Sequence, residues 1–217
     1  MAAIIYHEKS RIFHLYNQQI SYLMCVLENG HLGQLYYGKR IRDKEDFSYL
    51  IEKAPRPMAS YIYEGDRTFS LEHLKQEYPV YGTTDYRHPA VEILQENGSR
   101  LSDFRYAGHT INGGKRRLEG LPATYTESDD EAQTLTVILK DELTGVKLEL
   151  LYTIFEKDGV IARSVRFVNE GEAPVHLLTA MSLSLDLPDK DYVWLQLSGA
   201  WARERYVKTR VLEQGIQ

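Results

Sequence analysis

The chain has 217 residues, of which 43% are hydrophobic and 26% charged, an ordinary balance for a soluble globular protein. Its formal net charge of -5 argues against the basic face that binding to nucleic acid requires. No apolar run reaches the length that spans a bilayer, and the first residues lack the pattern of a signal peptide. We therefore expect neither nucleic acid nor a membrane as a partner.

Strand patterns begin near the N-terminus, where apolar and polar residues alternate with a period of two. Turn signals such as Asn29-Gly30 separate these runs. We predict strands at residues 4–6, 11–16, 20–27 and 32–37. Farther along, the Asn97-Gly98 turn predicts a hairpin between strands at residues 91–95 and 100–106.

Residues 65–89 fit neither a strand nor a plain linker, because they combine four aromatic side chains with Arg67, Asp85, Arg87 and two histidines. Long connections of this composition often bind ligands. They can also simply cover the edge of a sheet, and composition leaves both interpretations open. Within this stretch, residues 69–74 predict a short helix with Ser70 as its N-cap.

The second half of the chain has the clearest strand pattern. Four alternating runs predict an antiparallel meander of strands at residues 135–140, 146–155, 160–169 and 175–185. Such a succession with almost no helix predicts an all-β, antiparallel β-sandwich, and no linker divides residues 1–217 into independent domains. Two more strands are expected at residues 192–197, with Trp194 in the core, and at 206–212. Because a strand pattern runs to the end of the sequence without a closing turn, we expect the sandwich to be truncated before its last strands.

Cysteine and histidine usage limits the chemistry. Cys25 is the only cysteine and lies in the apolar run 22–27, so no internal disulfide can form and we expect a buried, inert thiol. A reducing, cytoplasmic location fits this composition best. The seven histidines are scattered without the spacing of metal ligands, so we predict neither a metal nor another cofactor.

The acidic residues do not form a recognisable active site. Glycoside hydrolysis needs two carboxylates about 5–9 Å apart. The candidate acids are Asp129, Asp130, Glu131, Asp141, Glu142, Asp186, Asp189 and Asp191. Adjacent acids in turns usually point to solvent, so we predict no catalytic residue in this chain.

Trp201 is a better candidate, for binding. It follows Gly199-Ala200 and precedes Arg203-Glu204-Arg205. An indole in such a turn can stack on the C–H face of a sugar, while nearby arginines donate hydrogen bonds to its hydroxyls. The alternative is a core tryptophan flanked by surface charges, and the pattern favours exposure at a site.

Four motifs, in order along the chain, resemble the N-terminal domain of the α-galactosidases of glycoside hydrolase family 36. They are Asp66-Arg67-Thr68-Phe69-Ser70-Leu71, Gln76-Glu77-Tyr78-Pro79-Val80-Tyr81-Gly82, Leu121-Pro122-Ala123-Thr124-Tyr125 and Gly199-Ala200-Trp201-Ala202-Arg203-Glu204-Arg205. The resemblance runs essentially from end to end. It implies a galactose-mutarotase-like β-supersandwich attached to a following (β/α)₈ barrel, in which both catalytic aspartates of the family lie.

The implied reaction is the retaining hydrolysis of terminal α-linked galactose in raffinose-type oligosaccharides. In the family this domain packs on the barrel and, in tetrameric members, reaches the active site of a neighbouring subunit. By match, the resemblance implies sugar contacts for Trp201, Arg67 and Glu52, the last at a position where the family carries an aspartate. The implied partners are an α-galactoside substrate, the chain's own barrel and, in a homotetramer, further copies of the chain.

Two other functions stay open at this point. The chain is also compatible with a free-standing, non-catalytic carbohydrate-binding β-sandwich, in which Trp201 binds galactose or raffinose without a barrel. A purely structural oligomerisation domain is the third interpretation, and in that case Trp201 serves assembly and leaves substrate affinity alone.

Overall fold

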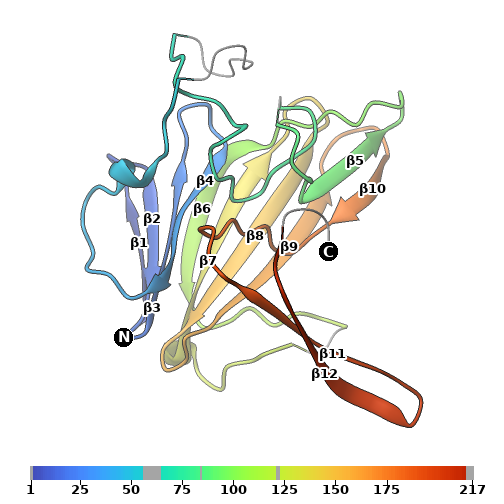
Figure 1. Cartoon of the computed structure of the whole chain (residues 1–217). Coiled ribbons are helices and arrows are strands. Elements are labelled where there is room, and N and C mark those ends of the chain that lie inside the picture. The colour runs from blue at the N-terminus through green and yellow to red at the C-terminus, as the bar shows by residue number, and fades with distance from the viewer. Residues whose placement is uncertain (1, 56–64, 84, 121–122, 214–217) are drawn as a thin grey trace. The chain divides into compact units, whose positions relative to one another are not determined.

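A computed structural model describes residues 2–55, 65–83, 85–120 and 123–213 (Figure 1). Within these ranges the only helical segments are two short 3-10 helices, η1 (Ser48–Leu50) and η2 (Asp129–Glu131). No helix in the described ranges is long and apolar enough to cross a membrane. The prediction of an all-β, antiparallel fold is confirmed, and the chain forms two compact units, Met1–Asp186 and Leu187–Gln217.

The first sheet of the larger unit is an antiparallel meander in chain order. Its strands are β1 (Ala3–His7), β2 (Ile12–Tyr16), β3 (Ile20–Val26) and β4 (Leu32–Lys39). All four strands predicted from the N-terminal alternation are confirmed.

The second sheet is also a meander, of β6 (Arg105–Gly113), β7 (Ala132–Lys140), β8 (Val146–Phe155) and β9 (Ile161–Asn169). The expected fourth strand of the C-terminal meander, β10 (Val175–Ala180), does not pair with β9. It pairs instead with β5 (Val91–Gln95), so the meander prediction is wrong for that strand.

The predicted hairpin around Asn97-Gly98 is also wrong. The turn itself forms, with Gly98 at a φ of +82° and the Gln95 amide bonded to the Ser99 carbonyl at 2.8 Å. Beyond it, the chain places Phe104 in the core instead of returning along β5. Turn residues specify a local reversal, whereas strand pairing depends on which face becomes buried.

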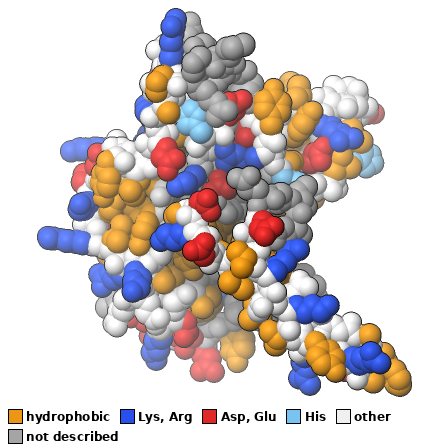
Figure 2. Space-filling view, in the orientation of Figure 1, with side chains coloured by type: hydrophobic (Ala, Val, Ile, Leu, Met, Phe, Trp, Pro, Cys, Tyr) orange, Lys and Arg blue, Asp and Glu red, His pale blue; other side chains and the backbone are white. Residues whose placement is uncertain are grey.

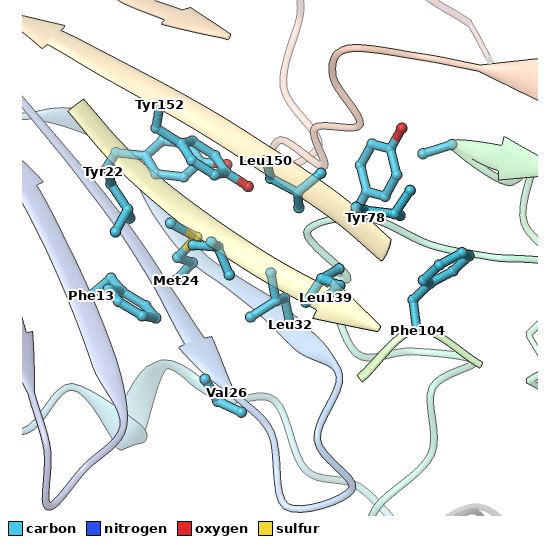
Figure 3. Close-up of a cluster of buried hydrophobic side chains, with 14 of the residues drawn as sticks. Phe13, Tyr22, Met24, Val26, Leu32, Tyr78, Phe104, Leu139, Leu150 and Tyr152 are labelled. Carbon is cyan, nitrogen blue, oxygen red and sulfur yellow. The ribbon is translucent and has the colours of Figure 1, made fainter. Parts of the chain in front are cut away.

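The main core lies between the two four-stranded sheets of the larger unit, as in a β-sandwich. Figure 3 shows Phe13, Tyr22 and Met24 from the first sheet lying with Leu139, Leu150 and Tyr152 from the second. Side chains on alternate positions of each strand enter this layer, which is what the period of two predicts.

A second core covers the other face of the first sheet. Leu23 and Cys25 point away from the sandwich and pack with Phe47, Phe69 and Leu71 from two long connections. Both faces of β3 are therefore buried, which explains why its sequence is a continuous apolar run instead of an alternating one. The prediction that Cys25 is buried is confirmed.

The smaller unit is an antiparallel hairpin of β11 (Val193–Ala200) and β12 (Arg203–Val211). None of its residues between 187 and 213 is buried. Trp194, expected in the core, is 50% exposed, so that prediction is wrong. The two-stranded ribbon has no second layer within the described residues that could bury a side chain at this position.

Candidate functional site

The β11–β12 hairpin presents Trp201 at its tip. Ala200 pairs with Arg203, so Trp201 and Ala202 form the two-residue turn, with Ala202 at a φ of +60°. Gly199 allows the close return of the chain, because a Cβ there would lie 2.0 Å from the Arg203 carbonyl oxygen. The indole is 92% exposed, and the Glu204 carboxylate accepts the Ala202 amide at 3.1 Å. The turn therefore holds a flat aromatic surface in solvent.

The hairpin stem has two chemically different faces. Directly paired residues share a face of a ribbon, so Leu195 and Leu197 lie with Thr209 and Val207. On the opposite face, Trp194, Gln196 and Ser198 are joined by side-chain hydrogen bonds of 3.0 and 3.2 Å. Figure 2 shows both hydrophobic and basic side chains along this hairpin. The apolar face is unburied within the described residues.

Arg67 and Glu52 lie on neighbouring segments of the larger unit. Both side chains are exposed. Lys53, next to Glu52, forms an ion pair of 3.1 Å with Asp66, next to Arg67. Glu52 itself pairs with Lys75 at 3.2 Å. The structure thus brings the Glu52 and Arg67 segments together, while Trp201 belongs to the separate hairpin unit.

Asp66 has the most perturbed carboxylate of these segments. Its side chain accepts both the hydroxyl and the amide of Thr68, at 2.6 and 2.8 Å. These hydrogen bonds, with the Lys53 charge, lower the pKa of Asp66 to about 2. The backbone that carries Arg67 is therefore fixed by an ionised carboxylate at neutral pH.

The stretch 65–89 contributes a buried ion pair to the sandwich core. The Glu77 carboxylate is fully buried and accepts hydrogen bonds from Tyr22 at 2.5 Å and Tyr152 at 2.8 Å. Arg163, from β9, lies 2.7 Å from Glu77, and its guanidinium lies 4.4 Å above the Tyr152 ring. In Figure 3 the Tyr22 and Tyr152 rings lie together between the sheets.

The electrostatics of this network reflect burial and pairing. Burial raises the pKa of the Glu77 carboxyl, while the Arg163 charge and the two tyrosine hydroxyls act in the opposite direction. Burial also raises the pKa of Tyr22 and Tyr152. Sequence reasoning missed this network, although the position of Arg163 among the inward-facing residues of its strand was a usable signal.

The expected helix at residues 69–74 is wrong. The segment forms successive turns, with the Glu72 amide bonded to the Ser70 hydroxyl at 3.3 Å. Arg87 Nη2 donates hydrogen bonds to the carbonyl oxygens of Leu71, Glu72 and Leu74, at distances of 2.8 to 3.3 Å. In a helix, backbone amides farther along the chain would donate to these carbonyls. Here the Arg87 guanidinium is the donor instead.

A Ser–His–Asp arrangement occurs beside the first sheet. His14 Nδ1 lies 2.7 Å from Asp43, and His14 Nε2 lies 3.0 Å from the Ser21 hydroxyl. His7 contacts the same Asp43 oxygen at 3.0 Å. Burial lowers the pKa of His14, and Asp43 opposes that effect. His14 and Ser21 are fully buried and the Ser21 oxygen accepts the Ile41 amide, so the group has no access to a substrate and holds the loop to the sheet.

The acidic candidates divide between solvent and structural roles. Asp129 and Asp130 are exposed in η2. Asp141 is buried and accepts the Leu143 amide at 2.9 Å, so the expectation that it points to solvent is wrong; a turn carboxylate can bond its own backbone instead. Among the described residues, no group of three or more histidines, cysteines or acids is placed to hold a metal ion.

Comparison with known proteins identifies the family. Residues 30–217 match the family model described as the glycosyl hydrolase family 36 N-terminal domain. The α-galactosidase AgaA of Geobacillus stearothermophilus is 44% identical over 215 residues, which cover 99% of this chain and 29% of the relative. The α-galactosidase Mel36A of Lactobacillus acidophilus is 37% identical over 99% of this chain and 29% of its own length.

Solved structures agree with the sequence matches. The crystal structure of AgaB from Geobacillus stearothermophilus has a TM-score of 0.90 at 44% identity, covering 99% of this chain and 29% of that one. The α-galactosidase of Lactobacillus brevis has a TM-score of 0.93 at 38% identity, covering 98% and 29%. The chain thus spans about 29% of the length of these relatives. The family resemblance found in the sequence is confirmed, and the chain belongs to the N-terminal domain family of glycosyl hydrolase family 36.

Proposed function

We propose that this chain is the N-terminal part of an α-galactosidase that hydrolyses terminal α-D-galactosyl residues of raffinose-type oligosaccharides. The match of residues 30–217 to the family 36 N-terminal domain carries this proposal. Variants of AgaA have been crystallised with raffinose and with stachyose, at 46% and 45% identity to this chain. In this proposal the catalytic aspartates belong to a (β/α)₈ barrel outside these 217 residues, and the present chain shapes the substrate site beside it.

We propose that Trp201, Arg67 and Glu52 contact the substrate. The 92% exposure of Trp201 supports stacking of its indole on a sugar face. Arg67 is exposed on a backbone fixed by Asp66, so its guanidinium can donate to sugar hydroxyls without a further cost of ordering the backbone. The Glu52 carboxylate can accept hydrogen bonds from sugar hydroxyls if it shares its oxygens with Lys75, 3.2 Å away, or releases that ion pair.

The division of labour can be tested with a chromogenic α-galactoside. The 217-residue chain alone should show no turnover above buffer, whereas the product of the longer coding sequence should be active. Turnover by the chain alone at a rate comparable with the longer product would contradict the absence of catalytic carboxylates here.

The sugar contact can be tested by comparing two tryptophans of the same hairpin. Trp201→Ala in the longer protein should raise KM for raffinose about tenfold or more, because it removes a stacking surface. Trp194→Ala, which changes the stem and not the tip, should leave KM within about twofold. An equal change in KM for both variants would contradict the proposed contact. Raffinose binding by the chain alone that depends on Trp201 would support the free-standing carbohydrate-binding module instead.

We further propose a homotetramer in which the apolar face of the hairpin stem is covered by another copy. Isolated two-stranded hairpins are marginally stable in water, and Leu195, Leu197 and Val207 are each more than 60% exposed. In the longer protein, Leu195→Glu should lower the oligomeric mass measured by light scattering. Gln196→Glu, on the opposite face of the hairpin, should leave that mass unchanged. A mass unaffected by Leu195→Glu would refute this face as the interface.

We also propose a cytoplasmic location. The chain's one cysteine is buried in an apolar environment and forms no disulfide. Cell fractionation with an antibody against the chain checks this, and recovery from the culture medium would overturn it.

A further inference from the structure

Arg87 lies near the end of the stretch 65–89, and all three nitrogens of its guanidinium have partners. Its Nε pairs with Asp85 at 2.8 Å and its Nη1 with Asp186 at 3.0 Å. Its Nη2 donates to the Leu71 and Leu74 carbonyls at 2.9 and 2.8 Å. One side chain therefore joins its own segment to two others, residues 71–74 and Asp186, the latter 99 residues away in sequence.

The first of these segments follows the proposed sugar contact Arg67. The turns at residues 69–74 hold few backbone hydrogen bonds of their own, and the Leu74 amide reaches the Ser70 carbonyl only at 3.3 Å. Arg87 supplies the donors that these carbonyls otherwise lack. Phe69 and Leu71 are buried against the first sheet, so the segment has one fixed position from which Arg67 projects.

The second segment is the point at which the larger unit ends. Asp186 is the last residue of that unit, and the hairpin unit that carries Trp201 begins with the next residue. The Asp186 carboxylate binds Arg87, and its amide donates to Gln34 Oε1 on β4 at 3.1 Å. Asp186 therefore connects the Arg87 guanidinium to β4 of the first sheet.

We infer that Arg87 is a positioning residue for substrate binding, because it fixes the segment that carries Arg67. This inference rests on the proposed function, in which Arg67 contacts the sugar. Lysine could not replace Arg87, because a single ammonium cannot direct donors to a carboxylate pair and to two carbonyls at once. Asp85 supports the arrangement, since it is buried and also accepts a hydrogen bond from Gln76.

Three variants of the longer protein separate the contributions. Asp186→Asn weakens only one of the contacts of Arg87, and the Asp186 carboxylate is partly exposed, so the fold should persist. Arg87→Lys keeps the positive charge but loses the planar set of guanidinium donors, and Arg87→Ala loses both. Arg100→Ala is the matched control, because Arg100 forms an exposed 3.0 Å ion pair with Glu92 in the same unit.

Steady-state kinetics with raffinose gives the expected result. Arg87→Ala and Arg87→Lys should raise KM about tenfold to a hundredfold with kcat within about threefold, because misplaced contacts weaken binding. Asp186→Asn should raise KM less, and Arg100→Ala should not change it. Hydrogen exchange in the chain should show faster exchange of the Leu74 and Asp186 amides in Arg87→Lys and not in Arg100→Ala, which verifies the structural effect even if Arg87→Ala fails to fold.

The outcomes distinguish this inference from the function on which it rests. If Trp201→Ala and Arg67→Ala raise KM and Arg87→Lys behaves like Arg100→Ala, positioning by Arg87 is refuted and the sugar contacts stand. If neither Trp201→Ala nor Arg67→Ala changes KM, the proposed contacts fail first. Faster amide exchange without any change in KM would also refute a role of Arg87 in substrate binding.

Discussion

Glu77→Gln is the most informative change to the fold, because it removes one charge from a buried pair and keeps the shape of the side chain. The carboxylate is fully buried and accepts hydrogen bonds from Tyr22 and Tyr152. Arg163, 2.7 Å away, is itself buried. After the substitution, the guanidinium has no counter-charge, and one of the two tyrosine hydroxyls faces an amide NH₂ donor instead of an acceptor.

The expected cost follows from that uncompensated charge. Breaking a buried ion pair by removing one partner costs about 3–5 kcal/mol. For a domain of this size each kcal/mol corresponds to about 2–4 °C, so the melting temperature should fall by about 6–20 °C. Tyr152→Phe removes one hydrogen bond to the carboxylate and should cost about 1.5–3 kcal/mol.

Urea unfolding followed by far-UV circular dichroism measures these differences. The matched control is Glu92→Gln, which breaks an exposed ion pair with Arg100 and should cost less than about 1 kcal/mol. A double variant, Glu77→Gln with Arg163→Met, should recover part of the loss, because no unpaired charge remains buried. The reasoning fails if Glu77→Gln is no more destabilising than Glu92→Gln.

Other consequences of the structure can be checked with simpler assays. Hydrogen bonding to His31 at 2.7 Å lowers the pKa of Asp103 to about 2, so its ionised form stabilises the fold above about pH 4 and that contribution is lost as the pH falls toward 2. Asp103→Asn should therefore lower stability at pH 6, by less than about 1 kcal/mol because the carboxylate is nearly half exposed, and have little effect near pH 2. Burial raises the pKa of Cys25 to about 12, so an aromatic disulfide reagent at pH 8 should label the unfolded chain and not the native one. Gly145→Ala should cost about 2–5 kcal/mol in thermal unfolding, because φ is +72° and the added Cβ would lie 2.7 Å from a neighbouring backbone atom. Gly98→Ala, at φ +82° in open space, should cost only about 1–2 kcal/mol.

The strands of the first meander, and β7, β8 and β9 of the second, could be predicted because each buries a face against the other sheet. That geometry imposes the period of two seen in residues such as Leu148, Leu150 and Tyr152 of β8. The pairing of β5 with β10 could not be predicted in this way. The two strands are about 80 residues apart in sequence, and neither alternation nor turn residues encode which distant edge a strand joins.

Part of the polar network was accessible from register alone. Once β1 and β2 are paired, Ile5 lies opposite His14, so His7 and His14 must share one face of the hairpin. Their common partner Asp43 lies in a connection without regular structure, whose path depends on burial of Phe47 in the second core. The two histidines were thus predictable as neighbours, whereas the carboxylate between them was not.

The stretch 65–89 shows why composition alone cannot separate a binding loop from a covering loop. Phe69 and Leu71 are buried in the second core over the first sheet, whereas Tyr78 is buried in the main core. Two charged residues of the stretch act in these cores: Glu77 lies in the main core, and Arg87 fixes the turns at residues 69–74. A loop held this rigidly can present an exposed side chain such as Arg67 in a defined position, whereas a loop without a buried face cannot. Covering the sheet is therefore compatible with the sugar contact that we propose for Arg67, and the two interpretations do not exclude each other.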